Sequence, residues 1–307
     1  MVWSSCTSSP PAYEGGGTMI SAILSYEFLQ NAFLSGLIIG VIAPLLGLFI
    51  VVRRLALIAD ALSHVALAGI AGSLYMSQQI LFFSALNPVY LGIVSAVGGS
   101  LLIEKLRGAY RHYEELAIPV ILSAGIGLGA IFISLSQGFA SDLVGYLFGS
   151  VSAVSRQDLW IVIVIAIVVI AYIRFLYKEL FILSFDPDYA KVSGVSSKYI
   201  QMVFMIITAL VIGASMRIVG ILLVSSLMTI PVAAAIQLAK SFKGALIYSI
   251  VFGEVAVIVG LVSAYHMDIA PGGTIVVTSI IILLLVLIWK KIQAGQNARA
   301  IKGQEIV

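Results

Sequence analysis

Residues 28–54 read FLQNAFLSGLIIGVIAPLLGLFIVVRR, an apolar run that carries no charge until two arginines close it. About 20 apolar residues in a helix cross the roughly 30 Å hydrocarbon core of a bilayer. Lipid offers no hydrogen-bond partners, so a spanning backbone must bond to itself, as it does in a helix. The short alternating segments typical of a membrane β-barrel do not occur in this sequence. The run therefore predicts a transmembrane helix and an all-α fold.

The same pattern recurs along the chain and predicts a polytopic bundle of about nine spans. Of 307 residues, 61% are apolar and 10% are charged, and the mean hydropathy is +1.13. Soluble domains carry about 25% charged residues, so this composition is not that of a soluble domain. A stretch at 143–154 is too short to span and is expected to be re-entrant or interfacial. The predicted spans are 28–52, 56–76, 86–103, 117–136, 159–177, 199–216, 218–239, 244–264 and 272–289.

The chain ends and the cation pattern define the predicted organisation. Residues 1–18 are rich in Ser, Pro and Gly and predict a disordered tail. Residues 19–290 form the transmembrane domain, and 291–307 form a cytoplasmic C-terminal tail. Lysines and arginines follow alternate spans, which by the positive-inside rule places the N-terminus outside and the C-terminus in the cytoplasm. Arg217, between two spans, is the exception, and we expect it to snorkel outward.

Three ionisable residues fall well inside predicted spans, where charge is costly and commonly functional. Asp60 and His64 are four residues apart in LIADALSHVALAG and share one helix face. Their oxygen and nitrogen suit a divalent cation such as zinc or manganese. The alternative is that the two side chains pair with each other and hold the bundle together. Glu254 is a weaker candidate ligand, because a neutral glutamic acid or a partner for a neighbouring hydroxyl explains it equally well.

Other features limit the possible functions. His266 and Asp268 lie at the external end of the eighth predicted span. They form either an external entrance for a cation or a solvated pair in a turn. The sequence contains no GxxxxGK[ST] loop, so this chain is not expected to be an enzyme that hydrolyses ATP. Its net charge of +3 gives no case for nucleic-acid binding, and its single cysteine excludes a thiolate metal cluster.

The polar insertion KELFILSFDPDYAKVSGVSSK (residues 178–198) contains a turn, a short amphipathic helix and a glycine stop. Together with other blocks it resembles the permease subunits of zinc/manganese ATP-binding-cassette importers, a family related in fold to vitamin B12 importers. The resemblance runs from about residue 29 to residue 285. Its blocks are RRLALIADALSHVALAG (53–69), DLVGYLFGSVSAVSRQDL (142–159), FDPDYAKVSG (185–194), VGILLVSSLMTIPVAAA (219–235) and DIAPGGTIVV (268–277).

The resemblance implies a transport subunit in a bacterial plasma membrane. It implies a homodimer that binds cytoplasmic ATP-binding subunits and receives a cation from an extracytoplasmic metal-binding lipoprotein. No cofactor is implied for this chain, only the transported zinc or manganese ion. The resemblance also implies that the Asp-x-x-x-His motif on the second span, here Asp60 and His64, is the metal site of the pathway. The residues VALAG after His64 are closer to the zinc-type pattern, since manganese-type members tend to carry proline there.

The same resemblance makes residues 184–195 the coupling segment that contacts the ATPase. Its candidate contact residues are Asp186, Asp188, Tyr189, Val192 and Gly194. Two other classes of function compete with this one. A proton-coupled secondary transporter would use Asp60, His64 and Glu254 as a proton relay, although no convincing internal repeat supports it. A membrane scaffold would tolerate apolar residues at all three positions.

Overall fold

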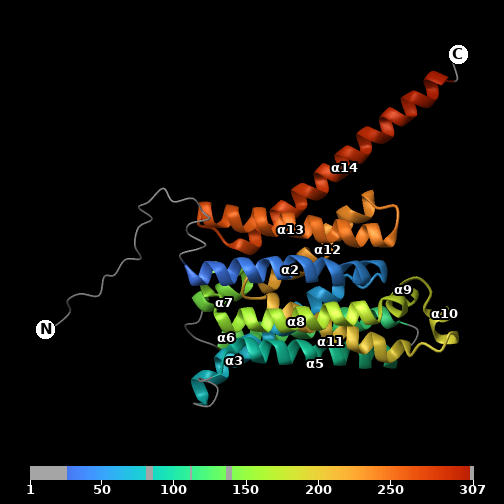
Figure 1. Cartoon of the computed structure of the whole chain (residues 1–307). Helices are drawn as coiled ribbons and strands as arrows, with labels where there is room; N and C mark the ends of the chain where they lie inside the picture. Colours follow the sequence, from blue (N-terminus) through green and yellow to red (C-terminus); the bar gives the residue numbers. More distant parts are fainter. Residues whose placement is uncertain (1–25, 81–85, 111–112, 136–139, 305–307) are drawn as a thin grey trace.

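The computed structural model describes residues 26–80, 86–110, 113–135 and 140–304. Within these ranges nine long helices form a bundle along a common direction, from which the C-terminal part of α14 diverges (Figure 1). Eight of them are long and apolar enough to cross a membrane, and the ninth, α12, is shorter. The nine helices are α2 (Glu27–Val52), α3 (Leu57–Gln79), α5 (Pro88–Ala109), α6 (Ala117–Leu135), α8 (Arg156–Phe175), α11 (Ser197–Ser215), α12 (Ile221–Leu238), α13 (Phe242–Met267) and α14 (Pro271–Gln304).

Short helices occupy the two ends of this bundle (Figure 1). One end holds α7 (Ala140–Phe148) and the 3-10 turn η2 (Val151–Ala153), and we call it the α7 end. The opposite end holds α9 (Tyr177–Phe185) and α10 (Pro187–Val192), and we call it the α10 end. A further 3-10 turn, η1 (Glu114–Leu116), precedes α6.

Each of the nine predicted spans corresponds to one of the nine long helices, which confirms the polytopic all-α prediction. The stretch at 143–154 forms α7 and η2 and does not cross the bundle. The helix α14 continues to Gln304, so residues 291–304 of the predicted C-terminal tail are helical. The predicted tail at 1–18 lies outside the described residues.

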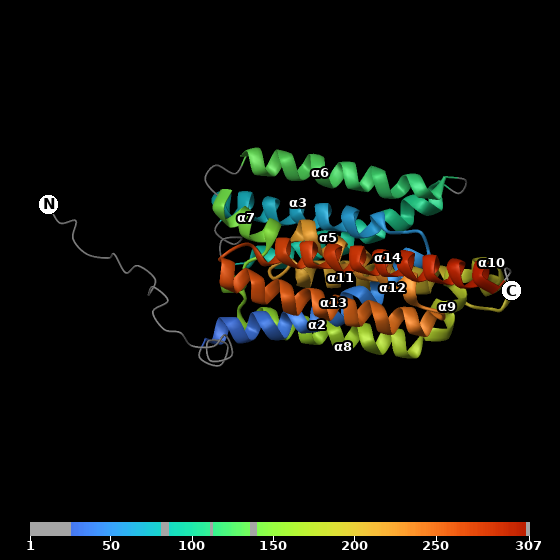
Figure 2. The same ribbon diagram turned by 90° about the horizontal axis from the view of Figure 1, so that it is seen from above.

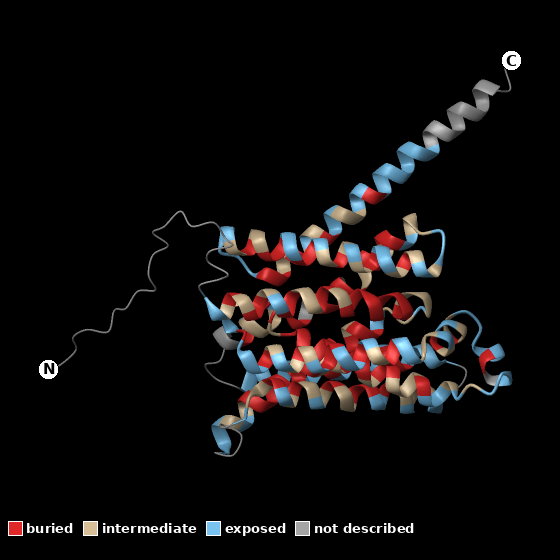
Figure 3. Ribbon diagram, viewed as in Figure 1, coloured by how far each residue is buried: buried red, intermediate tan, exposed pale blue. Residues whose placement is uncertain are grey.

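Two helices form the centre of the bundle. In α2 and α3, 72% and 78% of the apolar window is buried, against 22% in α14. Buried residues gather on the inner faces of the helices, and α6 lies at the edge beside α3 (Figures 2 and 3). Without a hydrophobic force between helices in lipid, close packing of small residues holds such a core together. A Cβ atom added at Gly47 of α2 would lie 1.9 Å from the Met228 carbonyl oxygen of α12, so this crossing requires glycine.

Candidate functional site

Asp60 and His64 lie one turn apart on α3, the most buried of the candidate spans. Both side chains are half-buried, while Ala61, Leu62 and Ser63 between them are buried. Within the described residues, neither side chain has a hydrogen bond or an ion pair to another group. Mutual pairing would require a short contact between the carboxylate and the imidazole. The described chain lacks that contact, which leaves both ligand atoms available.

The helix α6 fixes the backbone of α3 at this level. A Cβ atom added at Gly125 would lie 2.9 Å from the Val65 backbone nitrogen and 3.0 Å from the His64 carbonyl carbon. Glycine therefore lets α6 approach the main chain of α3 directly behind His64. One turn further, at Gly129, the same added atom would make only an ordinary contact, 3.8 Å from Ala68.

Glu254 lies elsewhere in the bundle, on α13 where that helix packs against α2. Its Oε1 atom is buried without a hydrogen-bond partner, and it would lie 2.8 Å from a Cβ atom added at Gly40. Among the described residues, no three His, Cys, Asp or Glu side chains come close enough to hold one metal ion. Glu254 therefore does not join Asp60 and His64 in a site within one chain.

His266 and Asp268 lie at the α7 end, where α13 stops, and both are exposed. The His266 Nδ1 lies 2.9 Å from the Val262 carbonyl oxygen. Because a carbonyl only accepts, Nδ1 carries the hydrogen and Nε2 keeps a free lone pair in the neutral ring. Asp268 caps the helix in the left-handed conformation, with φ of 52°. The pair can meet a cation arriving from outside the bundle.

Residues 184–195, the predicted coupling segment, contain the short helix that the sequence predicts, α10. Asp186 precedes α10, and its Oδ1 accepts a hydrogen bond from the Tyr189 backbone N–H at 2.9 Å. Gly194 ends the turn with φ of +78°, which favours glycine. Ala190 is fully buried, whereas Tyr189 and Val192 are 59% and 88% exposed. Large apolar side chains held in solvent at the tip of the bundle suit contact with another protein.

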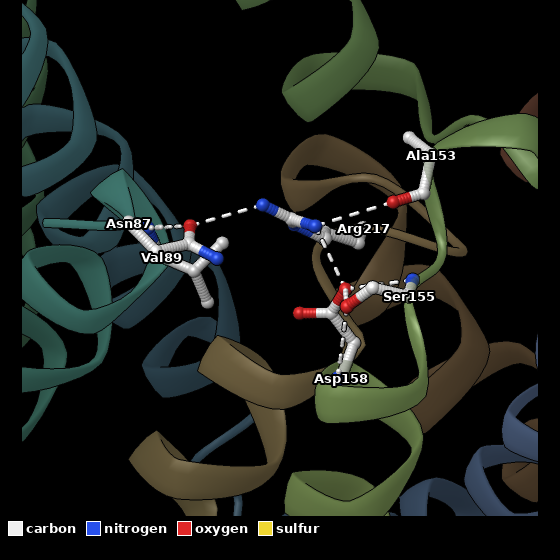
Figure 4. Close-up of polar contacts among 6 residues, drawn as sticks. All are labelled: Asn87, Val89, Ala153, Ser155, Asp158 and Arg217. Carbon is white, nitrogen blue, oxygen red and sulfur yellow. Dashed lines mark hydrogen bonds and ion pairs between the residues drawn. The ribbon is translucent and has the colours of Figure 1, made fainter. Parts of the chain in front are cut away.

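A polar cluster at the α7 end was missed by the sequence reasoning (Figure 4). Arg217 lies in the turn between α11 and α12, and its Nη1 pairs with Asp158 Oδ2 at 2.7 Å and donates to the Ala153 carbonyl oxygen at 3.2 Å. Its Nη2 donates to Asn87 Oδ1 at 2.9 Å. Arg217 thus bonds inward to α5, η2 and α8, and the expectation that it snorkels outward is wrong.

Two signals in the sequence could have revealed this cluster. Asn87 and Ser155 occupy N-cap positions, where such residues accept hydrogen bonds from the helix backbone. Asp158 completes a capping box with Ser155, and a carboxylate held there is available to a nearby cation. The odd arginine between two spans was the second signal, because a cation at membrane depth requires a partner.

The two ends of the bundle differ in charge. At the α7 end, Arg156 pairs with Glu27 and Arg217 pairs with Asp158. The α10 end carries many more cations, at positions 53, 54, 105, 107, 174, 178, 198, 240, 243, 290 and 291. The cations of the described residues therefore gather at the α10 end.

Comparisons with known proteins agree with this architecture. The profile described as "ABC 3 transport family" matches residues 25–290. A probable metal transport system membrane protein of Treponema pallidum is 35% identical and covers 86% of this chain and 96% of that protein. The manganese transport system membrane protein MntC of Listeria monocytogenes is 33% identical, and the match covers 87% of this chain and 92% of that protein. The manganese import system permease ScaB of Streptococcus gordonii is 34% identical, with the same two coverages.

Solved structures share the fold. The structure of PsaBC from Streptococcus pneumoniae in complex with Fab matches with a TM-score of 0.75 and 30% identity, covering 87% of this chain and 93% of that one. A transporter described as of the metal-chelate ABC type, in an inward-facing conformation, matches with a TM-score of 0.65 over 90% of this chain and 91% of that one. At 14% identity, the second match supports the fold alone.

Proposed function

The chain belongs to the ABC 3 transport family as the permease subunit of a metal importer, and from this we propose that two copies form the pathway of an ATP-driven importer for a divalent transition metal. The Asp60–His64 pair carries the proposal, because both side chains are half-buried in the central helix and neither makes a hydrogen bond or ion pair within the described chain. One chain supplies only two candidate metal ligands, Asp60 and His64. A two-fold axis that brings two pairs together would supply up to four.

These ligands suit transport rather than storage. A pathway site must bind strongly enough to replace water and weakly enough to release the ion. Carboxylate and imidazole, without the thiolates that hold zinc tightly, meet both demands. Glu254 is separated from the pair in this chain, so we leave it outside the proposed coordination.

Manganese is the first candidate cargo. Two of the relatives above are named for manganese, MntC and ScaB, at 33% and 34% identity. The VALAG sequence after His64 leans toward zinc, and no comparison confirms that preference. Uptake of radioactive manganese in the presence of graded zinc measures the preference directly. Inhibition by zinc well below the manganese concentration would reverse our assignment.

The orientation and the partners follow from the two ends. We place the α10 end in the cytoplasm, against separate ATP-binding subunits, because the cations gather there. The α7 end then faces outside, where His266 and Asp268 can receive the cation from a metal-binding lipoprotein. This arrangement puts the C-terminus inside and the N-terminus outside, in a bacterial plasma membrane.

The energy source distinguishes this proposal from a proton-coupled carrier. We expect manganese uptake into vesicles that hold the chain together with its ATP-binding subunits only when ATP is supplied on the α10 side. The matched control carries ATP-binding subunits inactivated in their catalytic residue. Uptake driven by an imposed proton gradient in that control, without ATP hydrolysis, would favour the carrier.

The coupling segment allows a second test. Tyr189 and Val192 are exposed on the short helix α10, so changing both to Asp should disrupt an apolar contact without opening the core. We expect the double variant to lose metal-stimulated ATP hydrolysis and uptake while its thermal stability stays near normal. Unchanged coupling in a folded double variant would move the ATPase contact to another part of the α10 end.

A further inference from the structure

A cleft of about 1140 Å³ opens at the α10 end, between the last turns of α2 and α5 and the first turn of α11, and is also lined by the end of α9 and by Pro187, the first residue of α10. Five of its lining residues are cations and two are carboxylates, which gives the lining a net charge of +3. Both carboxylates pair with the same cation: Arg107 lies 3.6 Å from Glu104 and 2.8 Å from Glu114. For the other four cations, Arg53, Arg54, Lys105 and Lys198, the described residues contain no carboxylate within 4.0 Å.

Arg53 is the deepest of these cations. Its Nε donates to Ser184 Oγ at 3.0 Å, its Nη2 donates to the Leu180 carbonyl oxygen at 3.3 Å, and its guanidinium lies 4.9 Å from the centre of the Phe204 ring. Its Nη1 is buried and has no hydrogen-bond partner among the described residues. All of these contacts are neutral, and a buried charge normally has a counter-charge.

The electrostatics of Arg53 favour an anionic ligand. The pKa of the Arg53 guanidinium is lowered to about 10, mainly by burial; Tyr172 opposes this fall and the charge of Arg107 adds to it. An anion beside Nη1 would satisfy the free donor and offset the charge. The free donor and the uncompensated cations at the mouth of the cleft thus point to the same ligand chemistry.

We propose that this cleft binds the phosphate headgroup of an anionic membrane lipid. The cleft lies where three spans begin or end, at Val52, Ser197 and the last turn of α5. Lipid phosphates lie at that level of a bilayer, and basic pockets between helix ends on the cytoplasmic side bind such headgroups. Apolar side chains of Leu101 and Met202 line the same cleft and can contact the beginning of an acyl chain.

This apolar lining favours a lipid over free phosphate, which would use only the cations. It also favours a lipid over an acidic side chain of an ATP-binding subunit. The exposed apolar residues of α10, Tyr189 and Val192, are the better contact for that subunit, and neither lines the cleft. The lipid would hold α2, α5 and α11 together at the end where coupling takes place.

Native mass spectrometry of the full chain in detergent, with and without its ATP-binding subunits, tests the proposal. The probes are phosphatidylglycerol and phosphatidylcholine with identical acyl chains, and inorganic phosphate. The test variant is Arg54→Gln with Lys105→Gln, two exposed cations at the mouth that leave the Arg53 contacts intact. The matched control is Lys240→Gln with Lys243→Gln, two exposed cations near the same end that do not line the cleft.

We expect the wild type and the control to retain phosphatidylglycerol over phosphatidylcholine. The cleft variant should bind phosphatidylglycerol roughly 30-fold more weakly, the equivalent of about 1 kcal/mol for each cation removed. Equal retention by the folded cleft and control variants would overturn the proposal. So would binding of inorganic phosphate without selective retention of lipid. Loss of ATP-binding subunits from the cleft variant, with lipid retention intact, would assign the cleft to that subunit instead.

Discussion

Asp60 and His64 on α3 differ from the polar cluster at the α7 end in whether their side chains bond within the chain. Arg217 and Asp158 bond to each other and to Ala153, Asn87 and Ser155, so their charges are used inside the chain. Asp60 and His64 are half-buried in the central helix, and neither bonds to any other described group.

This is the difference that we expect between groups that stabilise a fold and groups that bind a ligand. A buried charge without a partner is costly, and the cost is tolerated where the group meets something outside the chain. A charge with several partners acts on the fold, because its removal leaves those partners unsatisfied. Substitutions at the two places should therefore affect different measurements.

The largest effect is expected on α3. Replacing Asp60 or His64 by Ala removes a proposed ligand, and uptake per folded dimer should fall by more than the roughly 10- to 100-fold that loss of an outer-shell group costs. Thermal stability should change little, because neither side chain bonds within the described chain. Metal uptake and thermal unfolding of both variants, measured side by side, check this expectation.

Ser63 offers a matched control for that test. It lies between the two residues, and its buried hydroxyl has no hydrogen-bond partner among the described residues. Ser63→Ala should leave uptake intact, because it removes a polar atom that bonds to nothing described. Normal uptake per folded dimer in Asp60→Ala and His64→Ala would refute the metal site and leave α3 a structural element.

The α7 end should show the reverse result. Arg217→Gln leaves the carboxylate of Asp158, which is 6% exposed, without its cation, and breaking a buried pair in this way costs about 3 kcal/mol. The thermal midpoint should fall, while uptake per folded dimer stays near normal. Adding Asp158→Asn removes the orphaned charge and should recover part of the stability. A stable Arg217→Gln variant that fails to transport would give this cluster a role in the pathway.

The fold was predictable because its signal is long and repeated. Apolar runs such as 28–52 exceed the length that a bilayer requires, and lipid leaves the backbone no alternative to a helix. The helix ends were less predictable: α14 runs past Lys291 to Gln304 in a polar segment that contains no proline, the residue that most strongly breaks a helix, whereas hydropathy marks only the apolar part.

The shared helix face of the candidate pair was predictable from the sequence, and the neighbours of that pair were not. The spacing of Asp60 and His64 fixes their common face, because a helix repeats every 3.6 residues. The separation of Glu254 from that pair depends on which helices are adjacent, and depth in the membrane does not determine adjacency. Arg217 was misinterpreted for the same reason: its partners lie 59 and 130 residues away in sequence.

The smallest effect is expected at the contact that positions α3. Gly125→Ala places a Cβ atom 2.9 Å from the Val65 backbone nitrogen, and a main-chain atom cannot move aside as a flexible side chain does. Overpacking of this kind costs about 1–3 kcal/mol. The α3 backbone at His64 should shift by a fraction of an ångström, so we expect a moderate loss of stability and a several-fold loss of uptake.

Gly129→Ala, one turn along the same helix, is the control for this change. Its added Cβ atom would make an ordinary contact, 3.8 Å from Ala68, and alanine favours a helix by up to about 1 kcal/mol over glycine. Gly129→Ala should therefore be neutral or stabilising and should transport normally. If Gly125→Ala loses stability and uptake while Gly129→Ala keeps both, the position of the His64 backbone matters to transport. Equal behaviour of the two variants would mean that α3 tolerates displacement behind His64, and would weaken the contrast between a precisely held ligand pair and a merely structural cluster.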